Sequence, residues 1–376
     1  MTREFFPEQD ATPDPRKDPE SGALPGRDPN SLPRHGPARP GHLAQRDIRG
    51  NDPSNRERAT LRSSATRRRW NKIATGVLIV ALLLLPLVVH DTYILHVLIV
   101  IAINVIMAVS MWLLGITGLI SFGQAGFMFI GAMTTALLTK NAGWSFWVAM
   151  PLSATMAGLV SAPVGRLSLR VKGVYFFLVT LAFGQVVSGI FAYFQDPFGG
   201  WYGIRDIPPP QPSILFTTLN KVPFYYLALA LLLITCVVIH RVSRSWFGNV
   251  LWSIREGDLL ASSIGINVPG SKLIAFIVSA FFAGLAGSLY ATYFGYISPL
   301  VFTFDYSVNV LIYIVVGGFG SFAGPILGAV TLTLVPELFR VTGKYQNLLF
   351  GLILIVSMLT MPNGLIGAWH RLVRKT

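Results

Sequence analysis

The sequence predicts an all-α protein, a polytopic transmembrane helical bundle of about ten spans that follows a disordered basic N-terminal tail. Three observations predict it. Hydrophobic residues make up 52% of the 376 residues and charged residues only 12%, about half the charged share of an ordinary soluble domain. Apolar runs of membrane-crossing length recur from residue 73 to the end of the chain. About half of all charged residues lie ahead of these runs, in residues 1–69.

Residues 1–69 are predicted to be a disordered cytoplasmic tail. They are rich in Pro, Gly, Arg and Asp, so they cannot bury enough apolar area to offset the entropy lost on ordering. The tail ends in three arginines, residues 67–69, which favours contact with anionic membrane lipid. Its acidic residues dilute the basic charge and it carries no folded binding module, so we expect no nucleic-acid partner.

Residues 70–376 are predicted to form one membrane domain. Its ten predicted spans cover residues 73–89, 93–114, 119–138, 145–165, 174–194, 224–240, 273–294, 306–318, 322–339 and 348–361. Glycines allow the second, third, eighth and ninth spans to be broken or re-entrant. Placing both termini inside puts most Lys and Arg of this domain on the cytoplasmic side, as the positive-inside rule requires.

Chemistry-bearing residues are scarce within the spans. No Asp, Glu, Lys or Arg lies near the middle of any predicted span, which disfavours proton or sodium coupling. No G-x-x-x-x-G-K-[ST] loop is present, so the chain does not hold ATP in that way. Cys236 is the one cysteine, and no metal or cofactor motif accompanies it. We therefore expect a non-catalytic subunit whose energy comes from a partner.

A few polar side chains do lie within predicted spans, and each has two interpretations. Gln124, Gln185 and Asn309 are candidates to line a solute pathway. Alternatively, each forms hydrogen bonds between helices, because an unpaired amide in apolar surroundings costs a few kcal/mol.

Residues 241–272 form the longest predicted cytoplasmic connection. They contain a short amphipathic stretch, residues 252–264, which is followed by Gly265. Leu259, Leu260, Ile264 and Trp252 are expected to share its apolar face, whereas Arg255, Glu256 and Asp258 are expected to face water. Such a helix either lies inert under the membrane or serves as the handle by which a cytoplasmic motor moves the spans.

Four stretches carry a resemblance to a known family. They are GLISFGQAGFMFIGA at 118–132, LRVKGVYFFLVTLAFGQ at 169–185, IREGDLLASSIGINVPGSKLIAFIVSAFFAGLAGSLYA at 254–291, and GGFGSFAGPILGA at 317–329. Over about residues 95–361 the chain resembles the LivM-like permease subunits of bacterial branched-chain amino acid ABC importers.

The resemblance implies a multi-pass protein of the bacterial inner membrane that works within a larger transporter. It implies three kinds of partner: a second homologous permease, two ABC ATPase subunits and a periplasmic substrate-binding protein. It also implies that the segment 241–272 couples to the ATPases. The implied coupling residues are Arg255, Glu256, Asp258, Leu259, Leu260, Ala261 and Gly265.

A predicted outer loop, residues 196–221, resembles a family segment that contacts the binding protein or forms an outer gate. It contains FGGWYGIRDIPPP, in which Gly199, Gly200 and Gly203 are the candidate residues.

Other functions stay open at this point. A permease of the same fold could carry urea, a short amide or another small solute, because related permeases look alike. An ion-coupled carrier or channel that acts alone is a candidate of another class, and it predicts transport without an ATPase.

Overall fold

The computed structural model describes residues 76–77, 80–86, 91–171, 173–210, 221–339, 351–352, 354–355, 364 and 367. The predicted tail, the ends of the first predicted span and most of the tenth lie outside the described residues.

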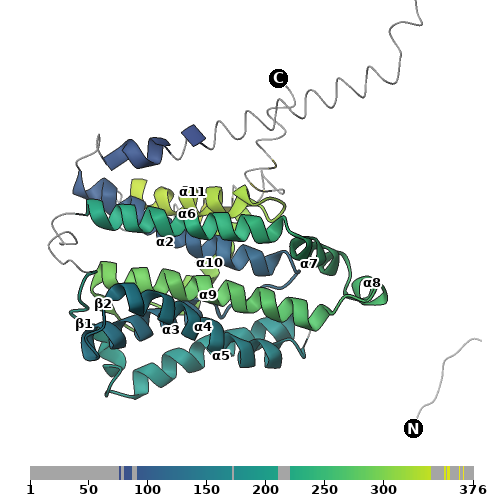
Figure 1. Ribbon diagram of the computed structural model, residues 1–376, viewed down its shortest axis with the longest axis horizontal. Coiled ribbons are helices and arrows are strands. Elements are labelled where there is room, and N and C mark those ends of the chain that lie inside the picture. The colour runs from purple at the N-terminus through teal and green to yellow at the C-terminus, as the bar shows by residue number, and fades with distance from the viewer. Residues whose placement is uncertain are drawn as a thin grey trace, which may run out of the picture. The chain divides into compact units, whose positions relative to one another are not determined.

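The described chain is mostly helical (Figure 1). Its longer helices are α2 (Thr92–Gly115), α3 (Gln124–Ala136), α4 (Phe146–Ser168), α5 (Val174–Tyr193), α6 (Val222–Ser243), α9 (Val268–Phe294), α10 (Phe304–Gly317) and α11 (Ala323–Leu338). Shorter elements are the π-turn η2 (Leu137–Asn141), the 3₁₀ turn η3 (Gly200–Tyr202), α7 (Trp246–Glu256), α8 (Asp258–Ser263), and the strands β1 (Ile204–Arg205) and β2 (Tyr296–Ile297). Residues 80–86 of the first predicted span are also helical.

Five of the described helices are long and apolar enough to cross a membrane, namely α2, α4, α5, α6 and α9. The predicted second span is one continuous helix, α2. The predicted third, eighth and ninth spans contain the shorter helices α3, α10 and α11, of 13, 14 and 16 residues. Apolar helices of this length fall short of the roughly 20 residues that a bilayer requires. The total of ten spans and the orientation stay predictions.

The centre of the bundle is formed by α2 and α9. In its most apolar stretch α2 is 89% buried and α9 67% buried, against 22% for α5. Small residues allow this packing, because α9 meets α3 where Gly131 lies against the backbone of Gly284, and Gly287 against the carbonyl oxygen of Met128. The same helix contacts α4 along much of its length.

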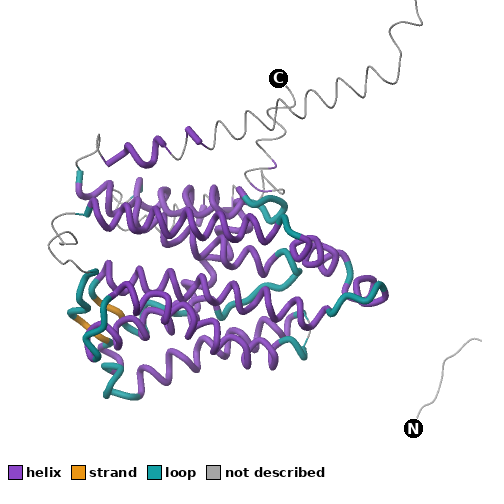
Figure 2. The backbone as a smooth tube through the Cα atoms, in the orientation of Figure 1, coloured by secondary structure: helices purple, strands orange, loops and turns teal. Residues whose placement is uncertain are grey.

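Two structured regions lie at opposite ends of the bundle (Figure 2). At one end α7 and α8 precede the start of α9. At the other end β2 follows directly after α9 ends at Phe294. It pairs antiparallel with β1, with Ile204 opposite Ile297. The helix α9 therefore runs from the predicted coupling segment to the predicted outer loop.

Candidate functional site

The predicted coupling segment consists of two helices rather than one amphipathic stretch. Gly257 separates α7 from α8 with an extended backbone, φ 173° and ψ 118°. Its N–H closes α7 by donating to the carbonyl of Ser253, and its carbonyl opens α8 by accepting from Ala261. Glycine is about 1 kcal/mol less favourable than alanine in a helix, so the break falls at this residue. The single continuous helix over residues 252–264 was the wrong prediction.

The two helices orient their apolar side chains differently. Leu259, Leu260 and Ile264 are 81%, 71% and 74% exposed. Trp252 instead packs half-buried against the main core from α7, so the expectation that it shares their face is wrong. Ala261, 2% exposed, faces inward. It joins a small separate core with Val250, Ile254 and Val268.

This small core holds α7, α8 and the start of α9 as one unit, and polar contacts complete it. Lys272 of α9 donates to both carboxylate oxygens of Asp258, at 2.7 and 2.8 Å. Gly265 adopts φ +85°, a left-handed conformation that favours glycine and ends α8. The side chain of Asn267 then accepts from the N–H of Gly270 and caps α9.

The predicted coupling residues therefore divide into two sets. Asp258 and Ala261 attach α8 to the bundle, whereas Leu259, Leu260 and Glu256 face outward. Gly265 ends α8 with its positive φ. Arg255 lies with its guanidinium 5.3 Å from the ring of Trp252 and 5.9 Å from that of Phe319. Sequence reasoning missed Phe319 and Lys272 as partners, because no periodicity relates positions so far apart in the chain.

The three candidate pathway residues do not form one site. Gln124 is buried, and its amide donates to the hydroxyls of Ser110 at 2.8 Å and Ser279 at 3.3 Å. It therefore joins α2, α3 and α9. Asn309 is half-buried on α10. Only Gln185, exposed on α5, faces a cleft.

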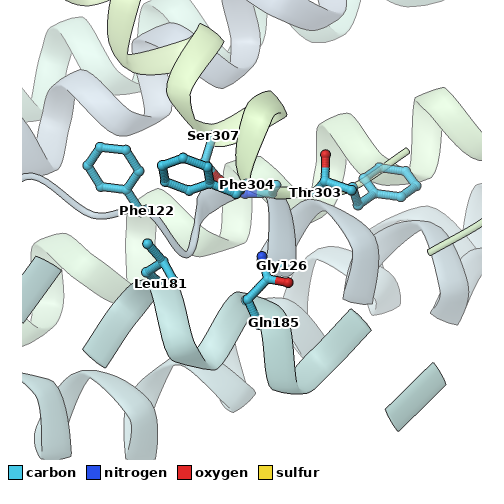
Figure 3. Close-up of a pocket in the computed structure, with 10 residues that line it drawn as sticks. Phe122, Gly126, Leu181, Gln185, Thr303, Phe304 and Ser307 are labelled. Atoms are coloured by element: carbon cyan, nitrogen blue, oxygen red, sulfur yellow. Dashed lines mark hydrogen bonds between the residues drawn. The ribbon is translucent and has the colours of Figure 1, made fainter. Parts of the chain in front are cut away.

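That cleft lies where α5 meets the first turns of α3 and α10 (Figure 3). It is closed in this conformation, with no room for a water molecule between its walls. Its walls combine apolar side chains with a few polar groups. They are Phe122, Ala125, Gly126, Leu181, Gly184, Gln185, Phe302, Thr303, Phe304 and Ser307. The hydroxyl of Ser307 accepts from the N–H of Ala125 at 3.0 Å, which joins α10 to α3 beside the cleft.

The predicted outer loop is folded against the segment that follows α9. Gly203, at φ +67°, lies against the carbonyl oxygen of Ile297, where a Cβ would not fit. Gly199 and Gly200 also have positive φ, +78° and +60°, and form the tight turn that leads to β1.

Two further contacts hold the loop. Lys140 donates to the carbonyl of Arg205 at 2.6 Å, and Ser298 donates to that of Trp201 at 3.4 Å. The rings of Trp201 and Tyr202 stay exposed and line a shallow surface cleft with Tyr193. Residues 211–220 of this loop lie outside the described residues.

Within the part of the chain that the structure describes, no three His, Cys, Asp or Glu residues lie close enough together to hold a metal ion.

Comparison with known proteins places these features in a family. The family model described as "Branched-chain amino acid transport system / permease component" matches residues 93–358. The LivM high-affinity branched-chain amino acid permease of Salmonella typhimurium is 36% identical over 278 residues, 67% of this chain and 64% of that protein. The LivM permease of Escherichia coli K12 is 34% identical over 274 residues, with the same coverage of both chains.

More distant relatives match shorter parts. The LivH permease of Escherichia coli K12 is 29% identical over 41% of this chain and 49% of its own length. A guanosine ABC transporter permease of Bacillus subtilis is 26% identical over 47% of this chain and 59% of its own. No solved structure matches.

The chain thus aligns with just under two thirds of the length of the two LivM proteins. The family model covers well over half of the chain, and the described helices include five of membrane-crossing length. The chain is therefore a multi-pass membrane protein that belongs to the family of branched-chain amino acid transport system permease components.

Proposed function

We propose that this chain is the membrane-spanning permease subunit of an ATP-driven importer for branched-chain amino acids in a bacterial inner membrane. The observation that carries the proposal is the 36% identity to a LivM permease over two thirds of the chain. The chain itself is non-catalytic, and ATP hydrolysis belongs to two ABC ATPase partners.

The other partners follow from the same family. Two differently named permeases of one kind of transport system, LivM and LivH, both match the chain. This supports a second, homologous permease as a partner within the membrane. A periplasmic binding protein would deliver the solute to the outer loop, where Gly199, Gly200 and Gly203 hold the exposed rings of Trp201 and Tyr202 in place.

The helix α8 is the proposed contact with the ATPases. An exposed apolar group such as Leu259 and Leu260 marks a docking surface when it lies outside lipid. Asp258, Ala261 and Gly265 fix α8 against α7 and α9, and Arg255 and Glu256 end α7 beside it. A rigidly held apolar surface can transmit a push from a partner, because it keeps its position relative to α7 and α9 when it is pushed.

The proposed solute pathway passes the cleft at Gln185. Phe122, Leu181 and Phe304 supply apolar walls for a branched side chain, and the Gln185 amide supplies hydrogen bonds. In this proposal Gln124 and Asn309 support the solute pathway rather than line the cleft. Gln124 holds α2, α3 and α9 together beside the cleft, and Asn309 lies further along α10.

A second candidate function has one observation in its favour. The match to a guanosine ABC transporter permease supports a same-fold importer for another small solute.

The experiment that decides between them uses the complete transporter. The chain is purified with its co-purifying subunits, reconstituted in vesicles and supplied with its binding protein. We expect ATP-dependent accumulation of leucine, isoleucine and valine, and little uptake of guanosine or urea. Accumulation by the chain alone, without ATPases, contradicts the proposal. Uptake of guanosine in place of the amino acids supports the second candidate.

A further inference from the structure

A cluster of aromatic rings lies at the coupling end of the bundle, and two of its members, Phe319 and Phe322, belong to the stretch at 317–329. Phe319, in the loop between α10 and α11, has its ring against Gly115 at the end of α2, where an added Cβ would meet the ring at 2.8 Å. The carbonyl of Phe319 accepts from Nε1 of Trp112 at 3.0 Å. The ring of Trp112 meets that of Phe322 edge-on at 5.5 Å, and Phe322 meets His240 of α6 at 4.8 Å.

These rings join four elements at one point. Trp112 and Gly115 belong to α2, His240 belongs to α6, and Phe319 and Phe322 bracket the loop between α10 and α11. Aromatic packing is dense and little compressible. A displacement applied to one member of this aromatic cluster is therefore shared with the ends of the other three elements.

Arg255 is the side chain of α7 that reaches this cluster. Its guanidinium lies over Phe319 and over Trp252 of its own helix, at 5.9 and 5.3 Å. Its stem passes Gly118, where an added Cβ would come within 3.9 Å of Cγ. Arg255 is exposed, and its guanidinium lies between water and these two ring faces.

A planar guanidinium suits this position better than an ammonium group does. It stacks on aromatic faces and carries a weaker hydration shell, so it can lie between two rings. The unit of α7, α8 and the start of α9 is attached to the bundle through α9 itself and through Leu251 and Trp252, which pack against the main core. Arg255 adds a direct contact to Phe319, in the loop between α10 and α11.

We propose that Arg255 is the positioning residue that transmits movement of α8 to the ends of α2, α10 and α11 through Phe319. This inference rests on the proposed function, because it assigns a route for the push that the ATPases deliver. Without the Arg255 contact, movement of α8 is no longer passed directly to Phe319, and part of each ATP-driven stroke is lost.

The test measures coupling in the complete reconstituted transporter, as substrate taken up per ATP hydrolysed. The variant is Arg255→Ala, and the matched control is Arg166→Ala, which removes an exposed arginine at the end of α4. We expect Arg255→Ala to assemble with the ATPases and hydrolyse ATP, while uptake per ATP falls about threefold to tenfold. Arg166→Ala keeps the wild-type ratio, and Arg255→Lys restores part of it.

A second variant, Phe319→Leu, removes the ring and keeps an apolar side chain in the same space. We expect the same loss of coupling. Adding Arg255→Ala to it should cause little further loss, because both changes break one contact.

An unchanged uptake-to-ATP ratio in Arg255→Ala overturns the inference. If hydrolysis and uptake fall equally, the ratio is unchanged and Arg255 is an assembly contact only. A wild-type transporter that imports no branched-chain amino acid contradicts the proposed function instead, and that outcome is visible before any variant is compared.

Discussion

Glycine decides how closely α3 and α9 approach. Gly131 faces the backbone of Gly284, and Gly287 faces the carbonyl oxygen of Met128, with no room for a side chain at either crossing. Helices in a membrane gain little from apolar burial against each other, so close backbone contact is a main source of their association. These two crossings therefore fix how α3 packs against α9, which lies at the centre of the bundle.

We predict that Gly131→Ala destabilises the protein by about 1–3 kcal/mol, because the added methyl group must push α9 away. The measurement is thermal unfolding in detergent, followed by tryptophan fluorescence. The matched control is Gly189→Ala on α5, where an added Cβ meets nothing within 4 Å. Equal melting temperatures for the two variants would contradict the packing role.

At this scale the sequence predicted some roles and not others. The sequence predicts that glycines allow the third span to be broken or re-entrant, but it does not predict that Gly131 packs against Gly284. It could not separate Gln124 from Gln185, since both are amides within apolar runs. What separates them is tertiary: Ser110 and Ser279 enclose the first, and the cleft exposes the second.

Among the elements, α8 is short but well held. Six residues are too few for a helix to be stable alone, so its stability comes from the small core around Ala261 and from the pair of Asp258 and Lys272. Its outward leucines contribute nothing to that core and stay available to a partner.

We predict that replacing Leu259 and Leu260 together by alanine weakens ATPase binding at least about tenfold. Each leucine buried at a partner surface contributes roughly 2 kcal/mol, and neither supports the fold here. The measurement is the amount of ATPase retained on the tagged chain after washing. Leu167→Ala, an exposed leucine at the end of α4, is the control and should retain it fully.

The position of a proline within α8 should decide how strongly it disrupts this helix. The N–H of Leu260 lies in the first turn of α8, where helices tolerate proline well. The N–H of Ala261 donates to Gly257 at 3.0 Å. We predict that Ala261→Pro abolishes uptake while the chain still inserts, and that Leu260→Pro has the smaller effect, as measured by transport and by membrane fractionation. One continuous helix over residues 252–264 would predict equal effects for the two proline substitutions.

For the whole molecule, apolar length and charge placement predicted a helical membrane bundle, and the bounds of α2, α5 and α6 lie within a few residues of the predicted spans. Periodicity could not reveal the break at Gly257, because the apolar pattern continues across it. Nor could it predict the β1–β2 pair, whose two strands have two residues each and are far apart in the sequence.

We predict that removing residues 1–60 leaves insertion and uptake nearly unchanged. The low apolar content of the tail gives it little to bury, and the arginines at 67–69 are retained for contact with lipid. Membrane fractionation and uptake by the shortened chain are the measurements. A shortened chain that inserts but no longer transports would show that the tail takes part in the cycle.

The unbroken length of α9 has a consequence for alternating access. A helix of 27 residues is about 40 Å long; one end is held by Lys272, and the other continues into the paired strand at Ile297. If it pivots near Gly284 and Gly287, where its backbone touches α3, a tilt of about 5° moves its first residue by about 2 Å and its last by about 1 Å in the opposite direction. The two ends of α9 would then move together in opposite directions, so that opening on one side of the bilayer and closing on the other become a single motion.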